Sequence, residues 1–190
     1  MKKKLFIIGI ITTLLLLFGF ITYQFIGFFD YKTSLSNLKK YQLSNDEIVI
    51  KEIKYDNKHY VISKDKVSSQ SNLTILLKDN NTYYMLENIK SCEVLDDQSN
   101  MYVKDNELYL HCIGKMKVID KYVVNDFNVD KITISFNFDD TPNISQLHMG
   151  IDSVDNKYIY LSTAFKADNT VKDKPKVKCS FSSKKCSYVE

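Results

Sequence analysis

The sequence contains no arginine, and all 26 of its basic residues are lysines. A guanidinium group reads phosphates and guanine edges through two parallel hydrogen bonds, which a lysine ammonium cannot form. The lysines are also interleaved with 23 acidic residues and do not gather into a basic stripe. We therefore expect no nucleic-acid partner.

Glycine is scarce, and only Gly114 and Gly150 lie beyond residue 29. Two isolated glycines cannot supply the G-x-S-x-G turn of serine hydrolases or the glycine-rich loops that cradle phosphates. The four cysteines are 20, 67 and 7 residues apart and the three histidines are scattered, so the spacing of a zinc site is missing as well. The sequence predicts no catalytic residue, no cofactor and no metal site.

A neighbouring His-Cys pair and two acidic doublets could in principle have a catalytic or metal-binding role, but a structural role fits each of them better. His111 and Cys112 are neighbours in an expected strand and so point to opposite faces, which argues against a nucleophilic pair. The acidic doublets at 96–97 and 139–140 fall between expected strands and lack the spacing of a calcium loop. We interpret both doublets as turns.

What the sequence does contain is a run of 25 residues without a charge, from residue 5 to residue 29. As a helix this run spans roughly 37 Å, more than the ~30 Å hydrocarbon core of a bilayer. It is longer than the apolar part of a signal peptide and is not followed by a small-residue cleavage site. We expect an uncleaved transmembrane helix.

The charges beside this segment orient it. Lys2, Lys3 and Lys4 precede it, which favours a cytoplasmic amino terminus. The expected organisation is a cytoplasmic tip at 1–4, a transmembrane anchor at 5–29, a stalk at 30–46 and a β domain at 47–190. The protein would be a single-pass protein of the cell membrane, with its carboxy-terminal domain outside the cytoplasm.

Beyond residue 46, short runs rich in Ile, Val and Tyr alternate with clusters of Asp, Asn, Ser and Lys, which indicates strands joined by tight turns. So many short strands favour antiparallel hairpins and an all-β class. The expected strands are 48–55, 60–63, 73–77, 83–86, 92–95, 101–104, 108–113, 117–124, 131–138, 158–163, 176–181 and 186–189.

One phrase recurs in this region: "DNKHYVIS", "DNNTYYML", "DNELYLH" and "DNKYIYLST" begin at residues 56, 79, 105 and 155. Each Asp-Asn is expected to reverse the chain into the next strand. The intervals of 23, 26 and 50 residues suit one hairpin, one hairpin and then two, and a four-stranded propeller blade has 40 to 50 residues. The region resembles the blade repeats of bacterial extracytoplasmic β-propellers. The resemblance implies an incomplete propeller-like arrangement, and a β-sandwich or meander remains open beside it.

The last two cysteines belong to one expected hairpin. A turn at Ser182 and Ser183 sets Cys179 directly opposite Cys186, within reach of a disulfide, so this pair is the disulfide candidate. Cys92 and Cys112 are expected two strands apart, too far to bond. The alternative for all four residues is that of small apolar thiols packed on a sheet.

These observations predict a membrane-anchored binding or interaction protein of the bacterial cell envelope. Its partners would be the lipid bilayer, through the helix, and a protein or an envelope polymer, through the β domain. Two alternatives remain: an envelope hydrolase of unrecognised type and a structural subunit of a membrane-associated assembly. A concave pocket with convergent titratable groups would favour the hydrolase.

Overall fold

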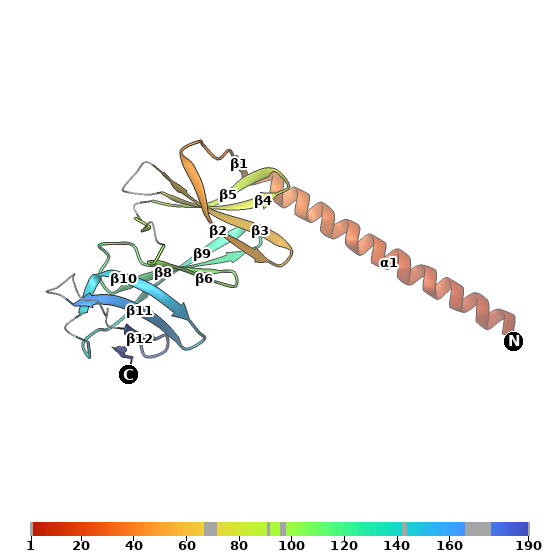
Figure 1. Cartoon of the computed structure of the whole chain (residues 1–190). Helices are drawn as coiled ribbons and strands as arrows, with labels where there is room; N and C mark the ends of the chain where they lie inside the picture. The colour runs from red at the N-terminus through yellow and green to blue at the C-terminus, as the bar shows by residue number, and fades with distance from the viewer. Residues whose placement is uncertain are drawn as a thin grey trace. The chain divides into compact units, whose positions relative to one another are not determined.

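A computed structural model describes residues 2–66, 72–90, 92–95, 98–141, 144–165 and 176–189. The chain divides into two compact units, Met1–Lys39 and Lys40–Glu190. The first is formed by the helix α1 (Lys2–Ser36), and the second contains all but the first residue of the strands. One amino-terminal helix followed by antiparallel sheets confirms the predicted class (Figure 1).

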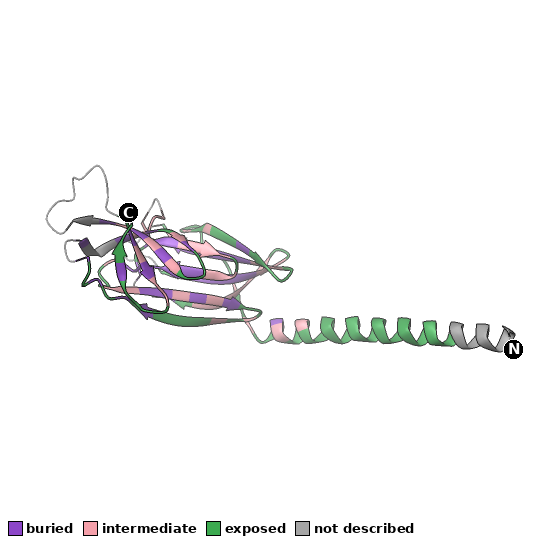
Figure 2. Ribbon diagram, turned by 90° about the horizontal axis from the view of Figure 1, so that it is seen from below, coloured by how far each residue is buried: buried purple, intermediate pink, exposed green. Residues whose placement is uncertain are grey.

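The helix α1 is the part of the chain suited to a bilayer. Its stretch Ile11–Ser36 is long and apolar enough to cross a membrane. Large apolar side chains such as Leu16, Phe18 and Tyr23 are 67 to 74% exposed, and Figure 2 shows exposed residues along the helix. The helix continues into the expected stalk as far as Ser36, and Lys39–Tyr41 forms strand β1 of the first sheet.

The β domain is built from three sheets that follow one another along the chain. The first sheet has the order β1-β5-β4-β3-β2, the second β6-β7-β8-β9 and the third β10-β11-β12-β13. The strands after β1 are β2 (Glu47–Tyr55), β3 (Lys58–Asp65), β4 (Leu73–Asp79), β5 (Thr82–Ile89), β6 (Met101–Lys104), β7 (Glu107–Leu110), β8 (Val118–Asn125), β9 (Asn128–Ser135), β10 (Ile144–Val154), β11 (Tyr158–Phe165), β12 (Lys176–Ser180) and β13 (Cys186–Tyr188).

All four Asp-Asn phrases lie at reversals between paired strands, as predicted. Asp56 and Asn57 both have positive φ, as do Asn80 and Asp105. Asp and Asn tolerate this left-handed conformation better than other residues with a side chain. The repeated phrase therefore encodes four of the hairpin turns, two in the first sheet and one in each of the others.

Two predictions about the strands are wrong. Residues 92–95 do not form a strand, and the strand β10 was not predicted. Its two-residue alternation is broken by register shifts between Ile144 and Met149 and between Ile151 and Ser153. Because alternation is the main signature of a half-buried strand, β10 could not be recognised from its pattern.

The second sheet lies between the other two (Figure 1). Toward the first sheet, Tyr60 Oη donates a hydrogen bond to the carbonyl of Asp126, and Lys58 Nζ lies 2.7 Å from the carboxylate of Asp126. Toward the third sheet, the N–H of Ile151 donates to the carbonyl of Ser99. A buried apolar cluster joins the second and third sheets and includes Tyr109, Ile119, Ile134, Phe136, Phe138, Ile159, Leu161, Val177, Cys179 and Cys186.

A buried carboxylate lies on the opposite face of the second sheet. Asp120 on β8 is 2% exposed, accepts a hydrogen bond from Thr133 Oγ1 at 2.7 Å, and forms ion pairs with Lys131 and Lys115 at 3.1 and 3.3 Å. Burial by itself would raise the pKa of Asp120, but the hydrogen bonds from Thr133 and Lys131 and the two lysine charges outweigh it, so this pKa is lowered.

This lowered pKa makes the stability of the β domain depend on pH. Since the folded pKa is below the ordinary value of 3.8, the stabilisation is present above that pH and is lost as the pH falls through the folded pKa. We expect Asp120→Asn to lower the free energy of unfolding at pH 7 by about 2 kcal/mol, with the difference from the unsubstituted protein shrinking below about pH 4. Thermal melts between pH 2 and pH 7 measure this difference.

Asp130→Asn is the matched control, because Asp130 is exposed on the neighbouring β9 and, among the described residues, accepts only from Asn125. We expect it to change stability by less than about 0.5 kcal/mol. A loss for Asp120→Asn that stays constant down to pH 2 would contradict the assignment of its effect to the carboxylate charge.

Candidate functional site

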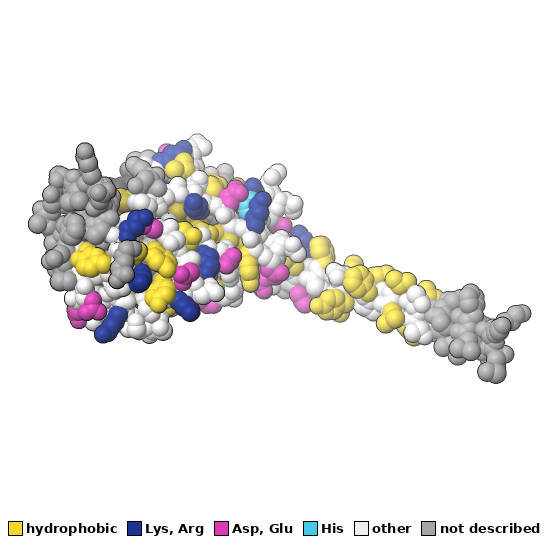
Figure 3. All heavy atoms as spheres, turned by 60° about the horizontal axis from the view of Figure 1, so that its bottom comes forward, with side chains coloured by type: hydrophobic (Ala, Val, Ile, Leu, Met, Phe, Trp, Pro, Cys, Tyr) yellow, Lys and Arg dark blue, Asp and Glu magenta, His cyan; other side chains and the backbone are white. Residues whose placement is uncertain are grey.

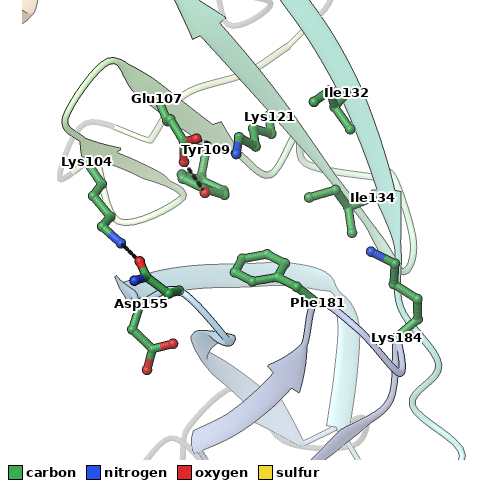
Figure 4. A pocket seen from close by; sticks show the side chains of 10 residues that line it. Lys104, Glu107, Tyr109, Lys121, Ile132, Ile134, Asp155, Phe181 and Lys184 are labelled. Atoms are coloured by element: carbon green, nitrogen blue, oxygen red, sulfur yellow. Dashed lines mark hydrogen bonds and ion pairs between the residues drawn. The ribbon is translucent and has the colours of Figure 1, made fainter. Parts of the chain in front are cut away.

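A cleft of about 440 Å³ lies between the second and third sheets (Figure 4). This volume is within the range of small-ligand sites. Four strands and two hairpin turns contribute to it. The lining residues are Lys104, Glu107, Tyr109, Lys121, Ile132, Ile134, Asp155, Asn156, Phe181 and Lys184.

The second sheet supplies one wall through a single face. Tyr109 on β7 pairs directly with Lys121 on β8, and Lys121 pairs with Ile132 on β9. Residues in register across antiparallel strands project to the same side, and so do residues two apart along one strand, such as Glu107 and Tyr109. The pairing of the strands therefore gathers a carboxylate, a phenol, an ammonium and an isoleucine on one surface.

Three of these groups form a closed network. Tyr109 Oη donates to one oxygen of Glu107 at 2.5 Å, and Lys121 Nζ lies 2.5 Å from the other oxygen. Lys121 Nζ also lies 5.4 Å from the centre of the Tyr109 ring. Both oxygens of Glu107 are thus engaged, and Figure 4 shows the three side chains together along the second sheet.

The electrostatics of the network keep Glu107 anionic and Tyr109 neutral at ordinary pH. Burial would raise the pKa of Glu107, but hydrogen bonds from Lys121 and Tyr109 and the charges of Lys121 and Lys104 lower it. Burial raises the pKa of Tyr109, and the hydrogen bond to Glu107 and its charge raise it further. Neither group titrates near neutrality, where a general acid or base would be useful.

The third sheet supplies Phe181 and Lys184 from the turn between β12 and β13. The backbone of Asn137 fixes this turn: its N–H donates to the carbonyl of Lys184 and its carbonyl accepts from the N–H of Cys186. The ring of Phe181 lies 6.1 Å from that of Tyr109 and 6.3 Å from that of Phe136. Figure 4 shows Phe181 between Lys104 and Lys184.

The turn between β10 and β11 forms the remaining side. Lys104 Nζ donates to Asn156 Oδ1 at 2.9 Å, which links the second sheet to this turn. Asp155 accepts from the backbone N–H groups of Lys157 and Tyr158 and from Tyr160 Oη. The two backbone bonds are the main cause of the lowered pKa of Asp155, so this carboxylate serves the turn.

Comparison with models of protein families, with curated proteins and with solved structures finds no match to this chain. The cleft must therefore be interpreted from its own chemistry. It combines apolar and aromatic side chains with three ammonium groups, and its carboxylates are already bonded within the protein.

The disulfide candidate lies beside this cleft. Cys179 and Cys186 are directly opposed on β12 and β13, in the register deduced from the sequence, with their Cα atoms 4.0 Å apart, and they form a disulfide. Val177, Cys179 and Cys186 are buried on the face that joins the apolar cluster. The disulfide closes the hairpin whose turn carries Phe181 and Lys184.

The expectation that Cys92 and Cys112 are too far apart is wrong, because they form a second disulfide with Cα atoms 4.8 Å apart. Residues 92–95 do not form a strand, and the disulfide joins them to the residues just after β7. The buried side chain of Asn100 holds them there, accepting from the N–H of Leu95 and donating to the carbonyls of Glu93 and His111.

The other candidates of the sequence have structural roles. His111 is fully buried, with Nε2 3.0 Å from the carbonyl of Lys115 and Nδ1 3.4 Å from the N–H of Met149, while its neighbour Cys112 is oxidised. Asp139 bonds Asn137 within a turn. Asp96 and Asp97 lie outside the described residues, and those described include no group of three metal-ligating side chains.

The cleft was not predicted from the sequence. Its lysines look like any others in a chain where positive and negative side chains are interspersed, as they are on the face in Figure 3. One signal was available: Phe181 follows Val177 and Cys179 at a spacing of two and therefore extends the apolar face of β12 into the turn.

Proposed function

We propose that this protein is a single-pass membrane protein of a bacterial cell envelope whose β domain lies outside the cytoplasm and binds a protein partner or an envelope polymer in the cleft between its second and third sheets. The observation that carries the location is the pairing of all four cysteines in two disulfides. Disulfides persist in oxidising compartments and are rare in the cytosol.

The helix α1 supports the anchoring part of this proposal. Its apolar side chains between Ile11 and Phe29 are exposed, which costs free energy in water and none in lipid. The three lysines at positions 2–4 favour a cytoplasmic amino terminus, so the domain that follows the helix would lie on the outer side.

The cleft supports binding rather than catalysis. Glu107 is bonded through both oxygens, Asp155 is bonded within its turn, and the pKa values of both are lowered. The cleft thus gathers titratable groups, the feature that would favour a hydrolase, but it holds them in structural bonds. Its accessible apolar side chains, Phe181 and Ile132, and its ammonium groups suit recognition.

We also propose that the three sheets are arranged like successive blades of an incomplete propeller. The second and third sheets are four-stranded meanders in chain order, and the first has the same meander in β2 to β5 with β1 added beside β5. Such meanders are the unit of propeller blades. In this arrangement the cleft is a groove between adjacent blades.

Location and redox state can be tested together in bacteria that express the full chain with an epitope tag after residue 190. We expect protease added to cells with a permeabilised outer layer and an intact cytoplasmic membrane to remove the tag, because the β domain would be accessible. A maleimide polymer should label the denatured protein only after reduction, and then at up to four sites, since four cysteines are present.

A cytosolic protein with a tag of the same kind is the control and should stay intact in the same cells. A protected tag, together with thiols that react without reduction, would place the β domain in the cytosol and contradict the proposed location.

A further inference from the structure

Three lysines and two carboxylates line the cleft, so its side chains carry one net positive charge. Lys121 is paired with Glu107, but Lys104 is bonded to the neutral amide of Asn156. Lys184 is exposed on its turn, and its Nζ has no hydrogen bond or ion pair with the described residues. The Lys184 ammonium is therefore available to an anion. Lys104 interacts electrostatically with Glu107 and Asp155 but keeps two N–H donors beyond its bond to Asn156.

The accessible apolar surface of the cleft comes from Phe181 and Ile132, because Tyr109 and Ile134 are only 3 and 7% exposed. Figure 4 shows Phe181 between Lys104 and Lys184. Phe181 is half-buried against Tyr109 and Phe136, and Ile132 is 48% exposed at the rim. A ligand that fits has an apolar body to cover these side chains and negative groups toward the lysines.

The polar groups of the cleft disfavour a carbohydrate. Sugar hydroxyls require several free donors and acceptors, because buried polar groups without partners cost free energy. Here the carboxylates of Glu107 and Asp155 and the amide oxygen of Asn156 are already bonded within the protein. The free donors that remain are ammonium groups, which pair best with carboxylates.

We infer that the cleft binds an acidic peptide segment of a protein partner, in which apolar side chains lie between carboxylates. The apolar side chains would cover Phe181 and Ile132, and the carboxylates would pair with Lys104 and Lys184. This inference rests on the proposed function and specifies its ligand: a segment from a protein in place of an envelope polymer.

The test uses the full chain in nanodiscs of neutral lipid and a fluorescent peptide with three leucines flanked by a glutamate on each side. Fluorescence anisotropy gives the Kd, and a peptide with glutamines in place of the glutamates is the uncharged comparison. We expect the acidic peptide to bind about tenfold more tightly or better, the size of one charge-assisted hydrogen bond. Added salt should reduce this advantage.

Substitutions of the cleft lysines test whether the acidic peptide binds in the cleft. Lys184→Met and Lys104→Met each keep the aliphatic stem, and each is expected to weaken the acidic peptide about fivefold to tenfold while leaving the glutamine peptide unchanged. Lys178→Met is the matched control: Lys178 lies on β12 outside the cleft lining, and its substitution should leave both affinities unchanged. Thermal melts check that each variant is folded.

Equal affinities for the two peptides, or an acidic peptide that binds Lys104→Met and Lys184→Met as tightly as the unsubstituted protein, would overturn the inference. Polygalacturonate, a carboxylated glycan, serves as a second ligand. If it binds in a manner that depends on Lys184 and the peptide does not, the acidic-peptide assignment is overturned while the proposed binding function stands. The location of the domain is decided separately by the protease and thiol experiments.

Discussion

Replacing Asn100 with alanine is expected to lower the free energy of unfolding of the β domain by about 3 kcal/mol. Asn100 is fully buried, and its amide bonds the N–H of Leu95 and the carbonyls of Glu93 and His111 at 2.8 to 3.0 Å. Alanine leaves these backbone groups without partners, and each group left unpaired inside the protein costs roughly 1 to 3 kcal/mol. The hydrogen bonds to the N–H of Leu95 and the carbonyl of Glu93 are only partly buried, so the expected loss is toward the lower end of the summed range.

Denaturant titration of the full chain, followed by circular dichroism because the chain has no tryptophan, measures this loss. Asn156→Ala is the control, since Asn156 is exposed and its amide oxygen accepts, within the described part of the chain, a single bond from Lys104. It should cost less than about 1 kcal/mol. If the two variants were equally stable, Asn100 would not have the organising role that its contacts indicate.

Removing the Cys92–Cys112 disulfide is the second change with a large expected effect. The double variant Cys92→Ala with Cys112→Ala should lose about 3 kcal/mol, because the bond closes a loop between residues 20 apart and restricts the unfolded chain. The Cys179–Cys186 bond spans only 7 residues, so the corresponding double variant should lose about 1 kcal/mol less.

Thermal unfolding of both double variants without reductant measures the order of the two losses. The unsubstituted protein in reductant should be less stable than either variant, since it lacks both bonds. A larger loss for the 179–186 pair would contradict the loop-entropy explanation and would indicate that native contacts of the two pairs differ in strength.

Local features of the sequence predicted much of the chain. The uncharged run at 5–29 predicted the helix, because a continuous apolar segment determines its own secondary structure in lipid. The Asp-Asn phrases predicted the hairpin turns, because left-handed backbone conformation depends on the residues of the turn itself. The register of Cys179 and Cys186 followed from the same local rule.

Features that depend on contacts between residues distant in the chain could not be predicted from the sequence. Strand β10 accommodates two register shifts. At Gly150 it lies so close to its neighbour β11 and to the residues before β6 that a Cβ there would meet Ser162 Oγ at 2.6 Å and the carbonyl of Ser99 at 3.3 Å. Such a strand is held by its neighbours, and its own alternation is interrupted. The position of Cys92 also depends on contacts distant in the sequence, because Asn100 bonds the carbonyls of both Glu93 and His111 and so holds Cys92 near Cys112.

The sequence by itself determined that this protein has one apolar helix and a domain of antiparallel hairpins, since both depend on residues close together in the chain. Only the tertiary structure decided which hairpins pack together, which cysteines pair across 20 residues, and that Lys104 and Lys184, 80 positions apart, line one cleft with Phe181. The physical reason is that hydrogen bonding within a hairpin is local, whereas a binding surface is made by side chains that meet only after the sheets have packed.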